Sequence, residues 1–163
     1  MLRPLAASTR DAGSVLIRTD RIEQFAVTPA ALWAAMGRTD DYRTWWPWLR
    51  RFDADGLVAG DRWTAVVQPP LPYRLEFTID LEQVEAPERI SAEVAGDIEG
   101  WARLELRPTG AGTALQLESE LAPTATFVEA VARFAPPIAR FGHRWVLDTG
   151  LAGFRRHALA SSR

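Results

Sequence analysis

The sequence predicts an α+β domain in which one antiparallel sheet is covered by a long C-terminal helix. Apolar and polar residues alternate with a period of two through most of residues 60–123, which is typical of strands with one dry and one wet face. Two short segments before them have the start and stop signals of helices. The segment after residue 123 is helical in composition and can cover the dry face.

Residues 14–27 predict the first strand, because apolar and β-branched residues recur at roughly alternate positions. The alternation slips near Asp20, which indicates a β-bulge. A helix should follow, since Thr28 is a good N-cap, Pro29 suits the first helical position and Gly37 suits the stop. Its apolar side would carry Leu32, Trp33 and Met36.

A second short helix is expected from Thr39 or Asp40 to Trp46, because Pro47 disfavours helical geometry at the preceding residue. The stretch YRTWWPWLRRF, residues 42–52, then holds three of the seven tryptophans. Each Trp can bury about 150–250 Å². One interpretation is core packing against the C-terminal helix; another is the mouth of a cavity, with Trp45 and Trp46 as ligand-binding candidates. A third is an exposed patch for protein interaction.

Runs separated by Gly and Pro predict a meander of five further strands. In residues 72–87, Tyr73 and Phe77 share the dry face, and Trp63 shares the dry face of its own run. These three are therefore candidates for the lining of a cavity, and Tyr73 adds a hydroxyl group that could orient a polar atom. The five runs are 60–70, 72–87, 88–98, 99–110 and 111–123.

Pro136 and Pro137 should end a short helix and begin a longer one that runs to about Leu159. Steps of about 100° per residue place mostly small residues on its buried side. The opposite, wet side would carry Arg140, Arg144, Asp148, Leu151 and Arg155. The buried side would carry Ala135, Ala139, Gly142, Val146, Thr149, Gly150 and Gly153.

Small residues along a buried stripe have two interpretations. Either the helix approaches the sheet closely, or bulky residues at its edges hold it away and leave a cavity. Those edges carry Phe141, Trp145, His143 and Phe154, and the first three are ligand-binding candidates.

Three residues are candidates for acid–base chemistry. His143 can exchange a proton near pH 7, although a buried structural histidine bonded to a carbonyl group is the ordinary interpretation. Tyr73 offers its hydroxyl group. Glu99 lies with Asp97 in the turn GDIEG, where a solvated hairpin is the ordinary interpretation and a carboxylate with a raised pKa is the functional one. Arg103 should lie on the outer face of its strand, and an inward orientation would suit an acidic ligand.

The composition limits the classes of partner and cofactor that we expect. The net charge is -2 and the 19 basic residues, all arginine, are dispersed, which argues against a nucleic-acid site. The absence of cysteine excludes thiolate metal sites, the two histidines make a zinc site unexpected, and no cofactor motif is found. With no signal peptide and no run of about 20 apolar residues, we expect a cytoplasmic protein without a membrane span. Residues 1–13 should be a loose tail and residues 14–160 one domain.

The order strand, two short helices, strand meander and long helix resembles the helix-grip architecture of the SRPBCC superfamily, which includes START domains, birch-pollen-type allergens and polyketide cyclases. The segments that carry the resemblance to bacterial polyketide cyclase/dehydrase-like members are TPAALWAAMGRTDDYRTWWPWL, GDRWTAVVQPPLPYRLEF, GDIEGWARLELRPTGAGTALQLESEL and FGHRWVLDTGLAGFRRHAL. The resemblance implies a sheet wrapped around the long helix with an internal cavity for an apolar or amphipathic molecule. It implies no single chemistry.

Two functions follow as expectations. The first is binding of a hydrophobic small molecule, such as a lipid or polyketide, for carriage or sensing. The alternative is a polyketide cyclase or dehydratase that uses the same cavity, in which His143, Tyr73 or Glu99 moves protons. The sequence leaves the oligomeric state and the ligand undecided.

Overall fold

The computed structural model describes residues 16–130 and 136–159, and the side chains of these residues except 130 and 136–141. In this part of the chain, seven antiparallel strands form one sheet in the order β1-β7-β6-β5-β4-β3-β2. The strands are β1 (Ile17–Phe25), β2 (Leu49–Asp53), β3 (Arg62–Val67), β4 (Leu75–Glu85), β5 (Arg89–Gly96), β6 (Ile98–Thr109) and β7 (Gly112–Pro123). The helices are α1 (Pro29–Met36), η1 (Thr39–Asp41), α2 (Tyr42–Trp45), α3 (Ala125–Ala130) and α4 (Pro136–His157).

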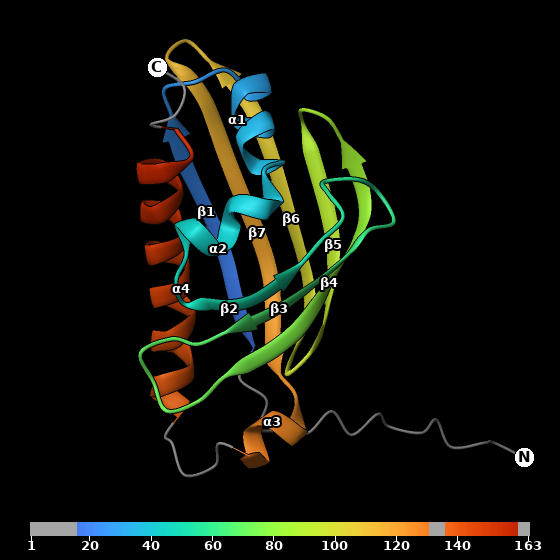
Figure 1. Ribbon diagram of the computed structural model, residues 1–163, viewed down its shortest axis with the longest axis vertical. Helices are drawn as coiled ribbons and strands as arrows, with labels where there is room; N and C mark the ends of the chain where they lie inside the picture. The colour runs from blue at the N-terminus through green and yellow to red at the C-terminus, as the bar shows by residue number, and fades with distance from the viewer. Residues whose placement is uncertain (1–15, 131–135, 160–163) are drawn as a thin grey trace, which may run out of the picture.

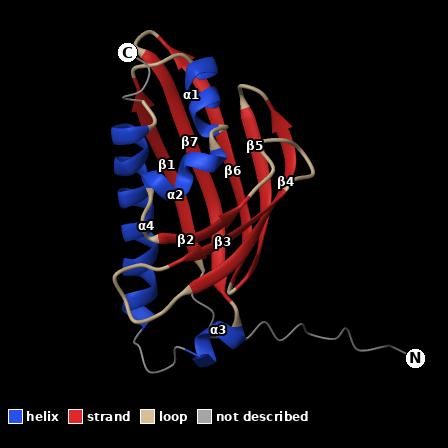
Figure 2. Ribbon diagram, in the orientation of Figure 1, coloured by secondary structure: helices blue, strands red, loops and turns tan. Residues whose placement is uncertain are grey.

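The sheet is curled, so that β2 and β3 pass in front of β6 and β7 (Figure 1). Helices α1 and α2 lie across its concave side, and α4 runs along the edge beside β1 (Figures 1 and 2). This is the α+β helix-grip arrangement that the sequence predicted. The predicted tail, residues 1–13, lies outside the described residues.

The helix signals in the sequence are confirmed by the geometry of α1. The hydroxyl group of Thr28 accepts a hydrogen bond from the backbone N–H of Ala31, and Gly37 follows the last helical residue. The next predicted helix is divided into the 3-10 turn η1 and the single turn α2. Trp46 leaves helical geometry with ψ 89°, as expected for the residue before a proline.

Three local predictions are wrong. Strand β1 pairs with β7 without a register shift, so there is no bulge at Asp20. Strand β2 was missed because its register shifts between Leu49 and Arg51, which breaks the alternation in the sequence. Tyr73 precedes β4, which begins at Leu75. The prolines just before Tyr73 have no N–H to donate to a neighbouring strand.

The buried face of α4 is wider than the small residues indicated. Leu151, which the sequence placed on the wet side, packs against the core with Val146. Phe154 is 8% exposed and meets the ring of Phe25 edge-on, with 6.0 Å between ring centroids. The prediction for Leu151 is wrong because α4 contacts both the curled sheet and the α2–β2 connection, so more of its circumference is covered.

Helix α4 is attached to strand β1 by polar side chains as well as by the contact of Phe154 with Phe25. The positions of the paired residues rise together along both elements, so the helix and the strand run in the same direction. Because the pairs connect distant parts of the sequence, they fix where α4 lies relative to the sheet. The pairs are Thr19 Oγ1 with His143 Nε2 at 3.1 Å, Arg21 with Asp148 at 2.6 Å, and Glu23 with Arg155 at 3.3 Å.

Candidate functional site

An apolar pocket of about 450 Å³ lies between the concave face of the sheet and the helices. Its size falls within the range of about 300–1,000 Å³ that is usual for small-molecule sites. We call it the inner pocket. The sheet contributes most of its wall through side chains that alternate toward the same face. From the middle strands these are Trp63, Ala65, Val67, Phe77, Ile79, Leu81, Ile90 and Ala92.

The remaining wall comes from β1, β2, β6, β7 and the helical segments. Strands β6 and β7 contribute Ala102, Leu104, Leu115 and Leu117. Helix α4 contributes Val146, Leu147, Gly150, Leu151 and Phe154. The first strand, the short helices, the α2–β2 connection (residues 46–48) and β2 contribute Phe25, Met36, Tyr42, Trp46, Trp48, Leu49 and Phe52.

The three clustered tryptophans have different surroundings. Trp45 is 6% exposed and belongs to the core, where its ring meets that of Phe154 at 5.8 Å. Trp46 lines the inner pocket, and its indole N–H donates to the backbone carbonyl oxygen of Gly150 at 2.8 Å. Trp48 also lines the pocket and stacks on Trp46, with 5.8 Å between centroids and 26° between ring planes.

The small residues of α4 make room for aromatic side chains from outside the strands. A Cβ atom on Gly153 would come within 2.9 Å of both Trp46 and the carbonyl oxygen of Trp45. Gly150 faces the six-membered ring of Trp48, and Gly142 faces the hydroxyl group of Tyr73. The core-packing interpretation of the tryptophan cluster predicted a contact with the C-terminal helix, and Trp45 and Trp46 make it. The two interpretations of the small-residue stripe considered only the sheet. On the same helix, Val146, Leu147 and Leu151 line the inner pocket.

The polar atoms of the pocket wall are largely engaged within the protein. The hydroxyl group of Tyr42 donates to the carbonyl oxygen of Met36, and burial raises the pKa of Tyr42 above its ordinary value. The indole N–H of Trp63 lies 2.9 Å from the carbonyl oxygen of Gly56. Arg103 also contributes to the wall, but its guanidinium group lies over the exposed ring of Trp101, so its side chain is on the outer face as predicted.

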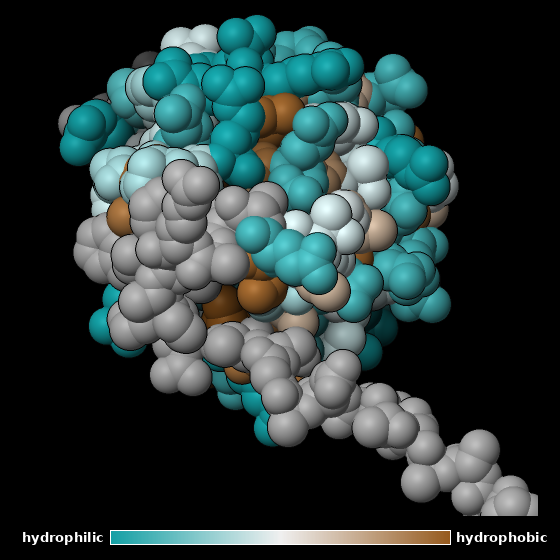
Figure 3. Space-filling view, turned by 90° about the horizontal axis from the view of Figure 1, so that it is seen from below, coloured by the Kyte–Doolittle hydropathy of each residue, from teal (hydrophilic) through white to brown (hydrophobic). Residues whose placement is uncertain are grey.

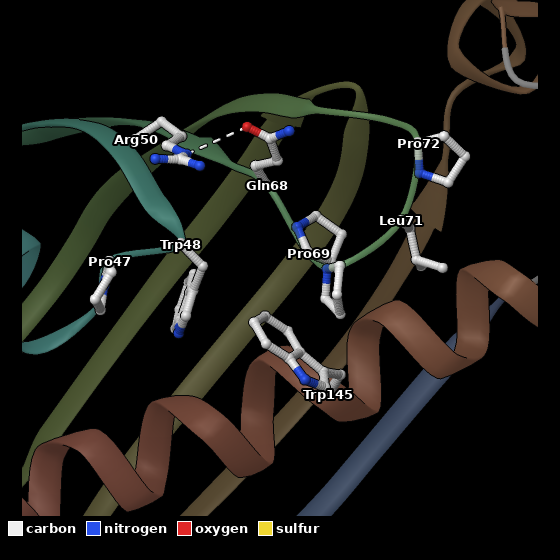
Figure 4. A pocket seen from close by; sticks show the side chains of 9 residues that line it. Pro47, Trp48, Arg50, Gln68, Pro69, Leu71, Pro72 and Trp145 are labelled. Atoms are coloured by element: carbon white, nitrogen blue, oxygen red, sulfur yellow. Dashed lines mark hydrogen bonds between the residues drawn. The ribbon is translucent and has the colours of Figure 1, made fainter.

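A second, more open hollow lies on the surface beside Trp48, and we call it the outer groove. Its volume is about 660 Å³, and four prolines line it together with two tryptophans (Figure 4). Trp48 and Trp145 face each other there, with 6.1 Å between ring centroids. Arg50 and Gln68 form its polar side through a hydrogen bond of 3.2 Å. Figure 3, which views the molecule from below, shows hydrophobic residues at the surface among hydrophilic ones.

The ligand-binding candidates from the sequence are distributed over several environments. Trp46, Trp63 and Phe77 line the inner pocket, and Trp145 lines the outer groove. Trp45, Tyr73 and His143 are not among the described residues that line either hollow. The side chain of Phe141 lies outside the described part of the structure.

The three catalytic candidates are not brought together at the inner pocket. His143 is hydrogen-bonded to Thr19, and burial lowers its pKa. Tyr73 packs edge-on against Phe127 with 5.6 Å between centroids, and burial raises its pKa. Glu99 is exposed at the start of β6.

Sequence reasoning missed several residues of the pocket wall. Trp48 was set aside in favour of its neighbours Trp45 and Trp46, although the same cluster contained it. Phe25 and Met36 come from elements whose ends approach the pocket only after the sheet has curled. The helical spacing in α1 identified Met36 as an apolar-face residue, but the sequence did not single out Phe25 and did not place the two in one pocket.

Within residues 16–130 and 136–159, no helix is long and apolar enough to cross a membrane. The same residues contain no cluster of three or more His, Asp or Glu side chains arranged to hold a metal ion.

Comparison with known proteins gives a family and a fold. No curated protein matches the sequence. A conserved protein from Geobacillus kaustophilus is similar in structure, with a TM-score of 0.71 at 11% identity over 89% of this chain and 97% of that chain. A protein from Thermus thermophilus has a TM-score of 0.69 at 14% identity, covering 91% of this chain and 100% of that chain.

The structure is also similar to norcoclaurine synthase from Thalictrum flavum, solved in complex with dopamine and hydroxybenzaldehyde. The TM-score is 0.58 at 12% identity, and 99% of each chain is covered. At these identities the likenesses show the fold. A family model described as "Polyketide cyclase / dehydrase and lipid transport" matches residues 18–158. The chain therefore belongs to this family, which has the SRPBCC-type fold that the sequence resemblance implied.

Proposed function

We propose that the protein binds a hydrophobic small molecule, such as a lipid, a polyketide or another ring compound, in the inner pocket, and that it serves as a carrier or sensor. The observation that carries this proposal is a pocket of about 450 Å³ whose wall is almost entirely aliphatic and aromatic. Transfer of apolar ligand surface from water into such a wall is favourable by about 25 cal/mol per Å² before the costs of ordering are subtracted.

The family description supports apolar ligands in general, because it includes lipid transport as well as cyclase and dehydrase activity. A cyclase or dehydratase in the same pocket is the alternative. Binding is favoured because Tyr42 and Arg103, the titratable residues of the described wall, interact with Met36 and Trp101 instead of pointing a free group at a ligand. None of His143, Tyr73 and Glu99 is among the described residues of that wall.

The proposal is tested with N-phenyl-1-naphthylamine, an apolar dye whose fluorescence increases in apolar surroundings. Ala102 lines the inner pocket on β6, and Ala95 is exposed on the adjacent strand β5. Ala102→Leu should fill part of the pocket and weaken dye binding by about tenfold or more, while Ala95→Leu should leave binding within about twofold of wild type. Thermal unfolding of each variant confirms that it is folded.

Two results would contradict the proposal. One is that the wild-type protein does not bind the dye, or any member of a lipid and polyketide panel, at high excess. The other is that Ala102→Leu and Ala95→Leu bind the dye equally well, which would place the binding site outside the inner pocket.

A further inference from the structure

Trp48 occupies the boundary between the two hollows. Its side chain lines both the inner pocket and the outer groove. One face of its ring stacks on Trp46, and the ring of Trp145 meets it at 69° across the groove. Its backbone is held by a hydrogen bond of 2.9 Å from the N–H of Gln68 to the Trp48 carbonyl oxygen. The backbone of this boundary residue is therefore fixed to the end of strand β3.

The indole N–H of Trp48 differs from the other aromatic donors at the inner pocket. The indole N–H groups of Trp46 and Trp63 and the hydroxyl group of Tyr42 each donate to a backbone carbonyl oxygen, and that of Trp63 also donates to the Asp61 carboxylate. The Nε1 atom of Trp48 is buried and has no acceptor among the described residues. A buried donor without an acceptor costs free energy, because it has lost its hydrogen bond to water.

Among the described residues, no hydrogen bond holds this donor in its present direction. Figure 4 shows the nitrogen-bearing part of the Trp48 ring turned toward α4, away from the polar pair Arg50 and Gln68. On α4 the ring faces Gly150. A side chain at this position would place its Cβ atom 3.6 Å from the nearest ring carbon, and glycine leaves that space empty. No hydrogen bond from the side chain to a described residue has to break when the ring turns.

We infer that Trp48 is the residue that orients the ligand: its indole N–H donates a hydrogen bond to an acceptor oxygen on an otherwise apolar molecule. This inference rests on the function proposed above. The ligand class is an apolar body that carries a carbonyl, carboxylate, ether or hydroxyl oxygen at the end beside the α2–β2 connection. Since Nε1 is enclosed in the structure, a small rotation of the ring accompanies binding and brings the donor to the ligand.

The test uses two probes of nearly equal shape, 2-acetylnaphthalene and 2-ethylnaphthalene, of which only the ketone has an acceptor oxygen. Their affinities are measured by displacement of N-phenyl-1-naphthylamine. Trp48→Phe should weaken binding of the ketone about fivefold more than binding of the hydrocarbon. The control is Trp46→Phe, which removes an N–H that already donates to Gly150 and should weaken both probes by the same factor.

A second measurement detects the hydrogen bond in the wild-type protein itself, and it uses the spectrum of the variant only to assign the Trp48 resonance. In a ¹H–¹⁵N spectrum, the Trp48 indole resonance is identified as the one missing from Trp48→Phe. It should shift downfield with 2-acetylnaphthalene and much less with 2-ethylnaphthalene, because a new hydrogen bond deshields the proton.

The outcomes separate the inference from the function. If both probes bind and Trp48→Phe changes their affinities equally, with no selective shift of the indole resonance, the inference is overturned and the proposed function stands. If neither probe nor the dye binds the wild-type protein, both fail. A loss that is selective for the ketone in Trp48→Phe and absent in Trp46→Phe supports the inference.

Discussion

The indole N–H of Trp46 donates to the backbone carbonyl oxygen of Gly150, at 2.8 Å, across 104 positions of the sequence. This bond attaches the α2–β2 connection to the middle of α4. One helical turn further, Gly153 gives the same indole ring the space that a side chain would occupy. The pocket wall at this end therefore depends on a glycine.

Substitution of the two glycines by alanine should have opposite effects. In Gly153→Ala the new Cβ atom would lie 2.8 Å from a ring carbon of Trp46 and 2.9 Å from the backbone oxygen of Trp45, which should cost about 1–3 kcal/mol. In Gly150→Ala the nearest atom is 3.6 Å away, so the gain in helix propensity, about 0.5–1 kcal/mol, should prevail. Urea unfolding measures both. Equal effects at the two positions would contradict the described contact with Trp46.

Stability should fall as the pH drops through the histidine range. Burial lowers the pKa of His143 in the folded state below the ordinary value of about 6.5, so the unfolded state binds this proton more readily. The contribution of neutral His143 is complete above pH of about 6.5 and is lost progressively below it. Urea unfolding of wild type and His143→Gln between about pH 5 and 8 measures this difference.

The wild-type protein should lose more stability toward low pH than His143→Gln, which retains an uncharged side chain that can still reach Thr19. Carboxylate protonation contributes to both proteins and cancels in the comparison. Parallel pH profiles for the two proteins would show that His143 is not the group responsible.

The two tyrosines should respond differently to removal of the hydroxyl group. Tyr42 is 8% exposed and its hydroxyl group donates to the carbonyl oxygen of Met36, so Tyr42→Phe should destabilise by about 1–3 kcal/mol. The Tyr73 hydroxyl has no hydrogen-bond partner among the described residues, so Tyr73→Phe should change stability by less than about 0.5 kcal/mol. Thermal unfolding compares them, and a larger loss in Tyr73→Phe would reverse the assignment.

The N-cap of α1 should contribute about 1 kcal/mol to the free energy of unfolding. Thr28→Ala removes the hydroxyl group that accepts from the Ala31 N–H, and α1 carries Met36 into the pocket wall. Thr44 is exposed within α2, so Thr44→Ala is the matched control and should be nearly neutral. Chemical unfolding of both variants checks the difference; a comparable loss in Thr44→Ala would mean that the cap is not its source.

Much of the fold could be predicted because its signals are local. The hydroxyl group of Thr28 reaches an N–H three residues away, and Gly37 ends the same helix, so a short window of sequence contains the whole interaction. The alternation through β4 likewise assigns Phe77 and Ile79 to one face without knowledge of the neighbouring strands. Strand β2 escaped because a register shift disrupts that alternation.

The sequence by itself determined the types of the elements other than β2, the dry face of the sheet and the apolar character of the tryptophan cluster. Tertiary structure decided which residues line the inner pocket: Trp48 and Leu151 belong to its wall, whereas Trp45 belongs to the core. The physical reason is that these outcomes depend on where α4 lies, and α4 is positioned by contacts such as His143 with Thr19 and Trp46 with Gly150, which join residues 124 and 104 positions apart.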